Sequence, residues 1–442
     1  MQAEELRRRV EAGEIDTVLL ALTDMQGRLQ GKRVTARHFL DEVIPHGAEA
    51  CNYLLAVDVE MNTVDGFAMS SWEQGYGDFE LRPDLSTLRH IPWHEGTALC
   101  LADLAWADGS DVVASPRQVL STQLARLAGH GWTANAGTEL EFLVFRDTYE
   151  DAWRKGYREL DPANLYNVDY SLLGTARVES LMRRIRNEMT GAGLEVESSK
   201  GECNYGQHEV NFRYTDALLC ADNHAIYKNG AKEIAAQENM AISFMAKFDE
   251  REGNSCHIHF SLADEDGPVF ERDRAVFESF LAGQLACLRE LILFLAPNVN
   301  SYKRYALGSF APTTVAWGKD NRTCALRVVG HGAGLRFEHR SGGGDLNPYL
   351  ALSAVIAAGL HGVERGLQLE PELQANAYLA SDKPRLPGTL RAARDLFADS
   401  EVAATAFGNE VVAHYVNSAD VELAAFAAAV TDWERFRGFE RL

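Results

Sequence analysis

The residues with the clearest chemical pattern lie in one short segment, from Arg336 to Arg340. Alternate side chains of a β-strand point to the same face, so a strand here would place Arg336, Glu338 and Arg340 together. Guanidinium groups bind anionic oxygens and a carboxylate binds a metal ion, so these charges suit a phosphate beside a divalent cation. A solvated strand face would carry the same residues, and the rest of the chain decides between the two interpretations.

Two other pairs of residues show the same alternation. Glu139 and Glu141 would share one face of a strand, a spacing that suits two neighbouring metal ions with one carboxylate each. His257 and His259 would present two imidazoles in the same way. Each pair alone is more often structural or solvated, so its meaning depends on what else the chain carries.

Two further acids and a late series of arginines complete the set. Glu202 and Glu209 flank a segment too irregular to form one element. The arginines are Arg304, Arg322, Arg327, Arg336 and Arg340. Acids, histidines and arginines together fit phosphoryl transfer, in which Mg²⁺ or Mn²⁺ and guanidinium groups balance the charge of the transferred phosphate. Since the chain has no Gly-rich loop ending in Gly-Lys-Ser/Thr, a nucleotide must be bound in another way.

The composition is that of a soluble globular protein with room for two or three domains: 442 residues, 46% hydrophobic and 24% charged. The net charge is -21 without any basic block, which argues against nucleic acid and anionic membranes as partners. The charged N-terminus is unlike a signal peptide, so we expect a cytoplasmic protein. Seven cysteines without a Cys-x-x-Cys pair predict reduced, mostly buried thiols.

Strands and helices must bring these distant residues together. Helices are expected at about 1–15, 116–127, 177–190, 216–239, 274–295 and 348–366. Strands are expected at about 16–23, 31–34, 48–59, 132–145, 194–198, 209–214, 241–247, 256–262, 323–329 and 334–340. The segment 61–83 is expected to be a long loop, which is uncommon without a function. Helices interspersed with strands on an antiparallel sheet predict an α+β fold.

Eight segments of the chain, in this order, resemble the successive motifs of the glutamine synthetase family. They are Asp24 to Lys32, Glu139 to Phe142, Gly206 to Glu209, His257 to Ser261, Asn300 to Arg304, Asn321 to Arg327, Phe337 to Arg340 and Asn347 to Leu350. The resemblance implies a small N-terminal β-grasp domain, here 1–112, and a larger α+β catalytic domain, here 113–442. It also implies homo-oligomeric rings, typically dodecamers, with active sites between neighbouring subunits.

The resemblance further implies a role for individual residues. Two or more Mg²⁺ or Mn²⁺ ions would be held by two sets of ligands: Glu141, Glu202 and Glu209 for the first, and Glu139, His257 and Glu338 for the second. His259 and Ser261 would contact ATP, and Arg322, Arg327 and Arg336 would face its phosphates. Gly253, Arg304 and Arg340 would surround glutamate. ATP would phosphorylate the γ-carboxyl of glutamate, and an amine would then displace the phosphate.

At one position the chain departs from the ammonia-using members of the family. These carry a glutamate that binds ammonium six residues after the arginine matched by Arg304, and this chain has Phe310. A benzyl group accepts no proton, but it packs against methylenes or offers a cation-π face. We therefore expect an organic amine as the nucleophile. Its second binding residue, an aspartate of the adjoining subunit in the family, would be Asp58 or Asp65, with Asp58 preferred.

Three amines and two other classes of protein remain as alternatives. Ethanolamine or a similar small primary amine ranks first. The spacing from Glu202 to Glu209 is one residue shorter than in the ammonia-using type and is similar to that of γ-glutamylethanolamide and γ-glutamylpolyamine synthetases. A polyamine such as putrescine or spermidine ranks second, and ammonia ranks third because of Phe310. A metal-dependent hydrolase would account for the His257 and His259 pair but not for the arginines. A catalytically inactive structural relative would not need the complete set of acids.

Overall fold

The computed structural model describes residues 1–442, and its smaller sheet belongs to the N-terminal part of the chain. This 6-stranded sheet has the order β2-β1-β6-β4-β3, with β5 paired to β6. Its strands are β1 (Thr17–Thr23), β2 (Leu29–Thr35), β3 (Ala48–Cys51), β4 (Asp78–Pro83), β5 (Arg89–His90) and β6 (Thr97–Ala105). β1 and β2 form an antiparallel hairpin because the Asp24 carboxylate accepts hydrogen bonds from the backbone of Gln26 and Arg28 across the turn.

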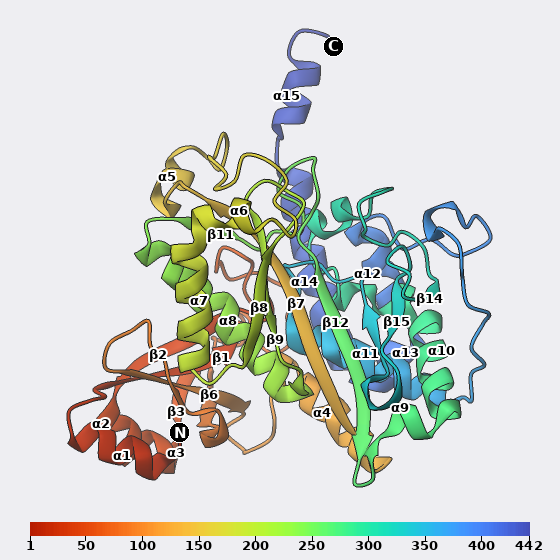
Figure 1. Ribbon diagram of the computed structural model, residues 1–442. Coiled ribbons are helices and arrows are strands. Elements are labelled where there is room, and N and C mark those ends of the chain that lie inside the picture. The colour runs from red at the N-terminus through yellow and green to blue at the C-terminus, as the bar shows by residue number, and fades with distance from the viewer.

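The larger, 10-stranded sheet forms the centre of the molecule, and its long strands β7 and β12 run through the middle of Figure 1. The order is β14-β15-β16-β12-β7-β9-β8, and β10, β11 and β13 pair at its margins. The main strands are β7 (Thr133–Phe145), β8 (Val196–Gly201), β9 (Gln207–Phe212), β12 (Cys256–Asp264), β14 (Trp317–Lys319), β15 (Leu326–Val329) and β16 (Arg336–His339). The marginal strands are β10 (Thr215–Asp216), β11 (Ala241–Ser243) and β13 (Gly267–Pro268).

Helices cover one face of the larger sheet and leave the other face to line cavities. The long helices are α4 (Pro116–Gly129), α7 (Glu179–Gly191), α8 (Ala217–Gln237), α10 (Arg274–Leu291), α11 (Pro348–Glu364) and α14 (Asn409–Ala428). α11 is buried on nearly all sides because apolar residues surround it, which is typical of a helix inside a core. The shorter helices are α1 (Ala3–Glu11), α2 (Ala36–His38), α3 (Ile44–His46), α5 (Tyr149–Arg154), α6 (Leu172–Thr175), α9 (Val269–Arg272), α12 (Leu390–Ala398), α13 (Glu401–Phe407) and α15 (Asp432–Gly438).

A buried ionic network joins the small sheet to the helices of the larger unit. The Arg117 guanidinium on α4 donates hydrogen bonds to Asp84 at 2.6 Å and Asp103 at 2.5 Å in the N-terminal part, and to Asp222 of α8 at 3.1 Å. The Tyr349 hydroxyl of α11 donates to Asp222 at 2.7 Å. Since Asp222 is buried, its charge requires these partners, and the network fixes the N-terminal sheet against the body.

The α+β fold with its antiparallel sheet confirms the prediction from sequence, but several elements differ. The strand expected over 48–59 ends at Cys51 and continues as a 3₁₀ turn, Asn52–Leu55. β6, the strand that joins the two halves of the small sheet, was not predicted, and β4 lies in the segment expected to be a loop. All seven cysteines are unpaired.

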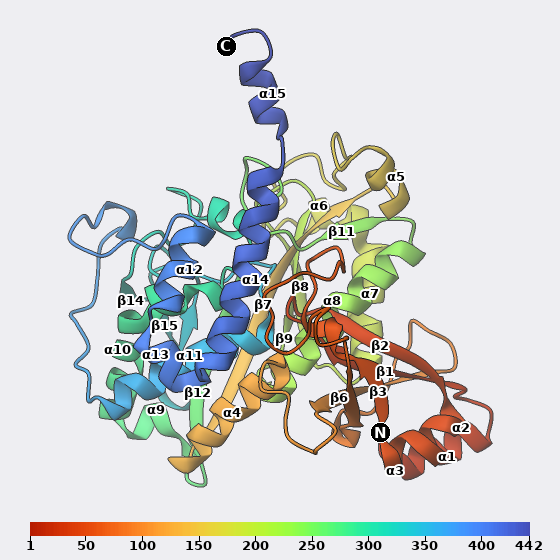
Figure 2. The ribbon, with the colours of Figure 1, turned by 180° about the vertical axis from the view of Figure 1, so that it is seen from behind.

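The C-terminal helix α15 projects from the body of the molecule in both ribbon views (Figures 1 and 2). Its aromatic side chains are largely exposed: Trp433 at 67%, Phe436 at 73% and the following Phe439 at 94%. No helix of this protein combines the length and apolar character needed to cross a bilayer.

Candidate active site

Strand pairing in the larger sheet lines up the charged residues predicted from sequence. Glu139 of β7 lies opposite His257 of β12, and Glu141 of β7 lies opposite Glu209 of β9. On the other side of β12, Glu338 of β16 pairs with His259. Because alternate residues of each strand share a face, the pairings carry these side chains across four neighbouring strands on one side of the sheet.

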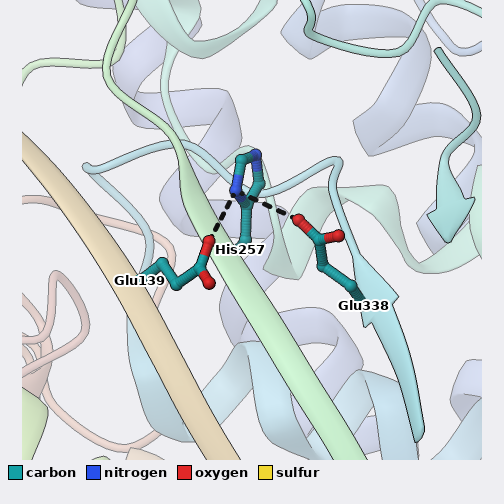
Figure 3. A group of neighbouring side chains, drawn as sticks. All are labelled: Glu139, His257 and Glu338. Carbon is teal, nitrogen blue, oxygen red and sulfur yellow. Dashed lines mark hydrogen bonds and ion pairs between the residues drawn. The ribbon is translucent and has the colours of Figure 1, made fainter. Parts of the chain in front are cut away.

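The first cluster consists of Glu139, His257 and Glu338, whose ligand atoms all lie within 4.8 Å of one another. Figure 3 shows the His257 ring between the two carboxylates, with its Nδ1 3.3 Å from Glu139 Oε2 and 3.3 Å from Glu338 Oε1. Burial, together with the nearby Arg340, lowers the pKa of His257, so its imidazole is neutral and has a lone pair for a metal ion.

Glu139 and Glu338 are ionised in spite of their burial. Burial opposes ionisation of Glu139, but hydrogen bonds with His257 and His259 outweigh it and lower the pKa of this carboxyl. Burial likewise opposes ionisation of Glu338, and its neighbours His257 and Arg340 hold its pKa below the usual range. Two anionic oxygens and one neutral imidazole nitrogen are a donor set that fits a divalent cation.

The second cluster consists of three carboxylates, Glu141, Glu202 and Glu209, again with ligand atoms within 4.8 Å. Burial raises the pKa of Glu209 to about 8, and the charges of Glu139 and Glu202 add to this effect. Burial and the neighbouring carboxylates also raise the pKa of Glu141. Since mutual repulsion disfavours three buried negative charges, the cluster is suited to a divalent cation that compensates them.

The arginines surround these clusters, and two of them bind Glu338. Arg327 Nη1 donates to Glu338 Oε2 at 2.9 Å, and Arg340 Nη1 contacts Glu338 Oε1. Arg336 lies further along the same strand, where its Nε donates to His259 Nδ1 at 3.2 Å. Arg322 is exposed and faces the same cavity as Arg327 and Arg340.

Two cavities on this face of the sheet share Glu139. A cavity of about 400 Å³ is lined by both carboxylate clusters, by Gly253 and Phe310, and by Arg322, Arg327 and Arg340, and we call it the acidic pocket. A neighbouring cavity of about 360 Å³ is lined by His259, Ser261 and Arg336 together with Phe212 and Tyr214. Of the residues predicted to contact ATP, His259, Ser261 and Arg336 line this second cavity, whereas Arg322 and Arg327 line the acidic pocket.

Arg304 lies beneath the acidic pocket and does not line it. It is fully buried, and its Nη2 donates to the backbone carbonyls of Ser341 and Gly342, each at 2.7 Å. Gly253 packs directly above, where a Cβ atom would lie 2.2 Å from Ala246 O and 2.9 Å from Arg304 Cγ. The glycine is therefore required by close packing, and Arg304 supports the pocket floor within the isolated chain.

Phe310 and Asp58, the two residues predicted for the amine, line different cavities of one chain. Phe310 lines the acidic pocket, is 56% exposed, and has a left-handed backbone with φ +57°. Asp58 lines a different cavity together with Glu422, and its carboxylate accepts hydrogen bonds from Glu60 N and Asn62 N. One chain by itself does not bring Asp58 to the pocket.

Asp169, Tyr170 and Lys200 are among the residues of the acidic pocket that the prediction from sequence missed. Lys200 of β8 contacts the Glu202 carboxylate and lies 3.4 Å from Asp169. Although burial opposes it, the Glu202 charge raises the pKa of Lys200. A signal was present, because Lys200 and Glu202 show the same alternation as the pairs that were recognised.

A small N-terminal sheet and a larger sheet with two cation-binding clusters and convergent arginines define the class, a ligase of the glutamine synthetase type. Comparison with known proteins bears this out: the catalytic domain of glutamine synthetase matches residues 113–437. The chain belongs to the glutamine synthetase family. It is therefore a carbon–nitrogen ligase that uses ATP and a divalent metal.

Individual proteins that are similar to this chain give a more specific comparison than the family does. The chain is 66% identical to γ-glutamylethanolamide synthetase GlnA4 of Streptomyces coelicolor, over 99% of this chain and 96% of that protein. It is 37% identical to a glutamate–isopropylamine ligase of a Pseudomonas species, over 98% and 97% of the two chains. Among solved structures, GmaS in complex with ADP superposes with a TM-score of 0.87 at 28% identity, over 100% of this chain and 99% of that one.

Proposed function

We propose that this protein joins the γ-carboxyl group of glutamate to a small primary amine, with ethanolamine as the preferred one, through γ-glutamyl phosphate. The observation that carries the proposal is the 66% identity to a γ-glutamylethanolamide synthetase over 99% of the chain. The presence of Phe310 in the acidic pocket supports it, because the ring offers a carbon surface where an acid would favour bare ammonium.

In this proposal the two clusters hold two Mg²⁺ or Mn²⁺ ions. Glu141, Glu202 and Glu209 bind one ion, and Glu139, His257 and Glu338 bind the other. When bound, the ions neutralise the phosphate oxygens and polarise the phosphorus that is attacked. His259, Ser261 and Arg336 bind the nucleotide in the neighbouring cavity, whose aromatic residues suit a base.

The protein side chains position the reactants and balance their charge. Arg322, Arg327 and Arg340 bind the anionic oxygens of the transferred phosphate and of glutamate, since guanidinium groups retain their charge and bind oxygen pairs. Arg304 holds the backbone at Ser341 and Gly342, and Gly253 leaves room for glutamate above it. The γ-carboxylate becomes an electrophile only after phosphorylation, and the amine then displaces phosphate.

We also propose that the chain divides into domains at 1–112 and 113–442 and that it assembles into a homo-oligomeric ring, a dodecamer in the family pattern. The location of Asp58 away from the acidic pocket supports an assembly, because a neighbouring subunit would be needed to supply this residue to the site.

A panel of amines tests the function. Purified protein is incubated with ATP, Mg²⁺, glutamate and one amine at a time: ethanolamine, isopropylamine, putrescine, spermidine or ammonium. Phosphate release and the mass of the product are measured. We expect the highest kcat/KM with ethanolamine and a γ-glutamyl amide as product. Highest activity with ammonium, or hydrolysis without any amine, would refute the proposal, and preference for putrescine would assign the polyamine instead.

A further inference from the structure

The acidic pocket contains a primary amine of the protein itself. Lys200 projects from β8 opposite Glu209 of β9, in the same sheet face as the carboxylate clusters. Its side chain is three-quarters buried, with 25% exposed. A surface ion pair would contribute little, but this ammonium group lies inside the cavity where the proposed reaction takes place.

Three groups surround the Lys200 ammonium group, and we call them the ammonium cage. Nζ contacts Glu202 Oε1, lies 3.4 Å from Asp169 Oδ1, and lies 4.5 Å from the centre of the Tyr170 ring. Two carboxylates and one aromatic face are the groups that bind a primary or free ammonium ion in proteins. Lys200 therefore occupies a site whose chemistry is that of an ammonium receptor.

Tyr170, the aromatic member of the cage, has an uncommon backbone conformation. Tyr170 has φ +54°, a left-handed conformation that is unfavourable for a bulky residue, and its side chain is 73% exposed. Phe310, on the same pocket, shows the same conformation with φ +57°. Strained residues of this kind are retained where a functional site needs them, and here two aromatic residues line one cavity.

We propose that Lys200 is a tethered ammonium ion that fills the cage, keeps free ammonium out of it, and thereby reinforces the preference for an organic amine that Phe310 establishes. An ammonium group fixed to the chain has an effective concentration that free ammonium does not reach in the cell, so it wins the competition for the cage. An alkylamine gains its binding energy from its carbon stem, beside Phe310, and depends less on the cage. This inference rests on the proposed function.

The variant Lys200→Ala empties the cage and keeps its three walls. We expect the ratio of kcat/KM for ammonium to kcat/KM for ethanolamine to rise at least about tenfold. Lys200→Arg retains a cation and should keep the wild-type ratio. Arg213→Ala is the matched control, because it also removes one positive charge, but from an exposed pair with Glu195 on the neighbouring strand end. A merely structural role would lower both kcat/KM values and leave the ratio unchanged, which would overturn the inference.

A second measurement does not depend on catalysis. The melting temperature of each protein is compared in ammonium chloride and in sodium chloride at equal ionic strength. We expect ammonium to raise the melting temperature of Lys200→Ala by at least about 2 °C over sodium, and to leave the wild type unchanged. Lys200→Ser serves as a second opened cage if the alanine variant does not fold. Absence of the ammonium effect in the opened cage would overturn the inference, whereas absence of amine-dependent turnover in every variant would refute only the proposed function.

Discussion

In our proposal, the side chain of Phe310 distinguishes a pocket for organic amines from a pocket for ammonium. Its ring lines the acidic pocket, and its carbonyl oxygen accepts a hydrogen bond from Arg340 Nη2 at 3.3 Å. The backbone of Phe310 thus contacts an arginine that binds the phosphorylated carboxyl group in our proposal. The identity of the residue could be read from the sequence, but its position against Arg340 could not.

Replacing Phe310 with glutamate should shift the reaction towards ammonium. Phe310→Glu introduces a carboxylate that attracts ammonium and removes the carbon surface for ethanolamine, so we expect ammonium kcat/KM to rise and ethanolamine kcat/KM to fall, each at least about tenfold. Steady-state phosphate release measures both. Leu307→Glu is the control, because Leu307 is 74% exposed on the same loop and does not line the pocket. Strong use of ammonium by the wild type would contradict the role given to Phe310.

A variant of Glu209 tests the proposed cation site without a measurement of catalytic activity. Saturating Mn²⁺ should stabilise the wild-type protein, because binding to the folded state shifts unfolding by mass action. Glu209→Gln removes one of three carboxylates and should weaken Mn²⁺ binding at least about tenfold, or about 1.4 kcal/mol. The melting temperature is measured against Mn²⁺ concentration, with the exposed Glu195→Gln as control. Equal Mn²⁺ responses in Glu209→Gln and wild type would exclude Glu209 as a ligand.

At the scale of elements, strand register assembles the site. Glu139 and His257 are 118 positions apart in sequence, and they meet because β7 and β12 pair antiparallel with these two residues opposite each other. A shift by one residue would turn every ligand to the opposite face of the sheet. The apolar residues that alternate with the ligands, such as Leu140 and Ile258, are buried and hold the register.

His414 of helix α14 should make the folded protein less stable at acidic pH. This side chain packs 4.6 Å from the Phe67 ring of the N-terminal part, and burial lowers its pKa from 6.5 to about 4. Between these two values the unfolded chain binds a proton that the folded chain does not, so stability falls as the pH decreases through this window. At pH 5 the loss attributable to His414 is about 2 kcal/mol.

The variant His414→Phe removes the titratable imidazole and keeps a buried aromatic ring. We expect its free energy of unfolding to decrease between pH 7 and pH 5 by about 2 kcal/mol less than that of the wild type, measured by urea denaturation. Other buried histidines, such as His208 and His224, remain in both proteins and cancel in the comparison. His38→Gln, at an exposed position, is the control for the loss of one histidine. An unaltered pH dependence in His414→Phe would contradict this account.

At the scale of the whole molecule, the C-terminal arm, residues 430–442, makes an ion pair with the body through Asp432 and Arg158 but leaves its aromatic side chains exposed. α15 projects from the body and exposes Trp433, Phe436 and Phe439 (Figures 1 and 2). Isolated apolar side chains are common on surfaces, but three exposed aromatic residues within one short projecting segment are unusual. Burial against another subunit would remove these side chains from water.

Deleting residues 430–442 should therefore reduce the size of the assembly. We expect the truncated protein to elute as a smaller oligomer, with its mass determined by light scattering, because the apolar contacts of the arm are lost. The variant Trp153→Ser is the control, since this tryptophan is also 73% exposed but lies on the body in α5. A truncated protein with the same mass as the full chain would show that the arm does not hold the assembly together.

The sequence alone determined the candidate residues for the chemistry, because the alternation of charged residues along β-strands and the order of the motifs are local properties. These properties were enough to predict the α+β class, the family and the two sets of carboxylates. They did not predict β6, whose place between β1 and β4 depends on strand pairing over long distances.

Only the tertiary structure decided which of these side chains meet. It brought Lys200 into contact with Glu202 beneath Tyr170, placed Arg304 under the acidic pocket, and left Asp58 beside Glu422 in another cavity. The physical reason is that such contacts depend on register between strands and on the packing of loops. A linear pattern contains neither of these, because both arise from interactions among residues far apart in the chain.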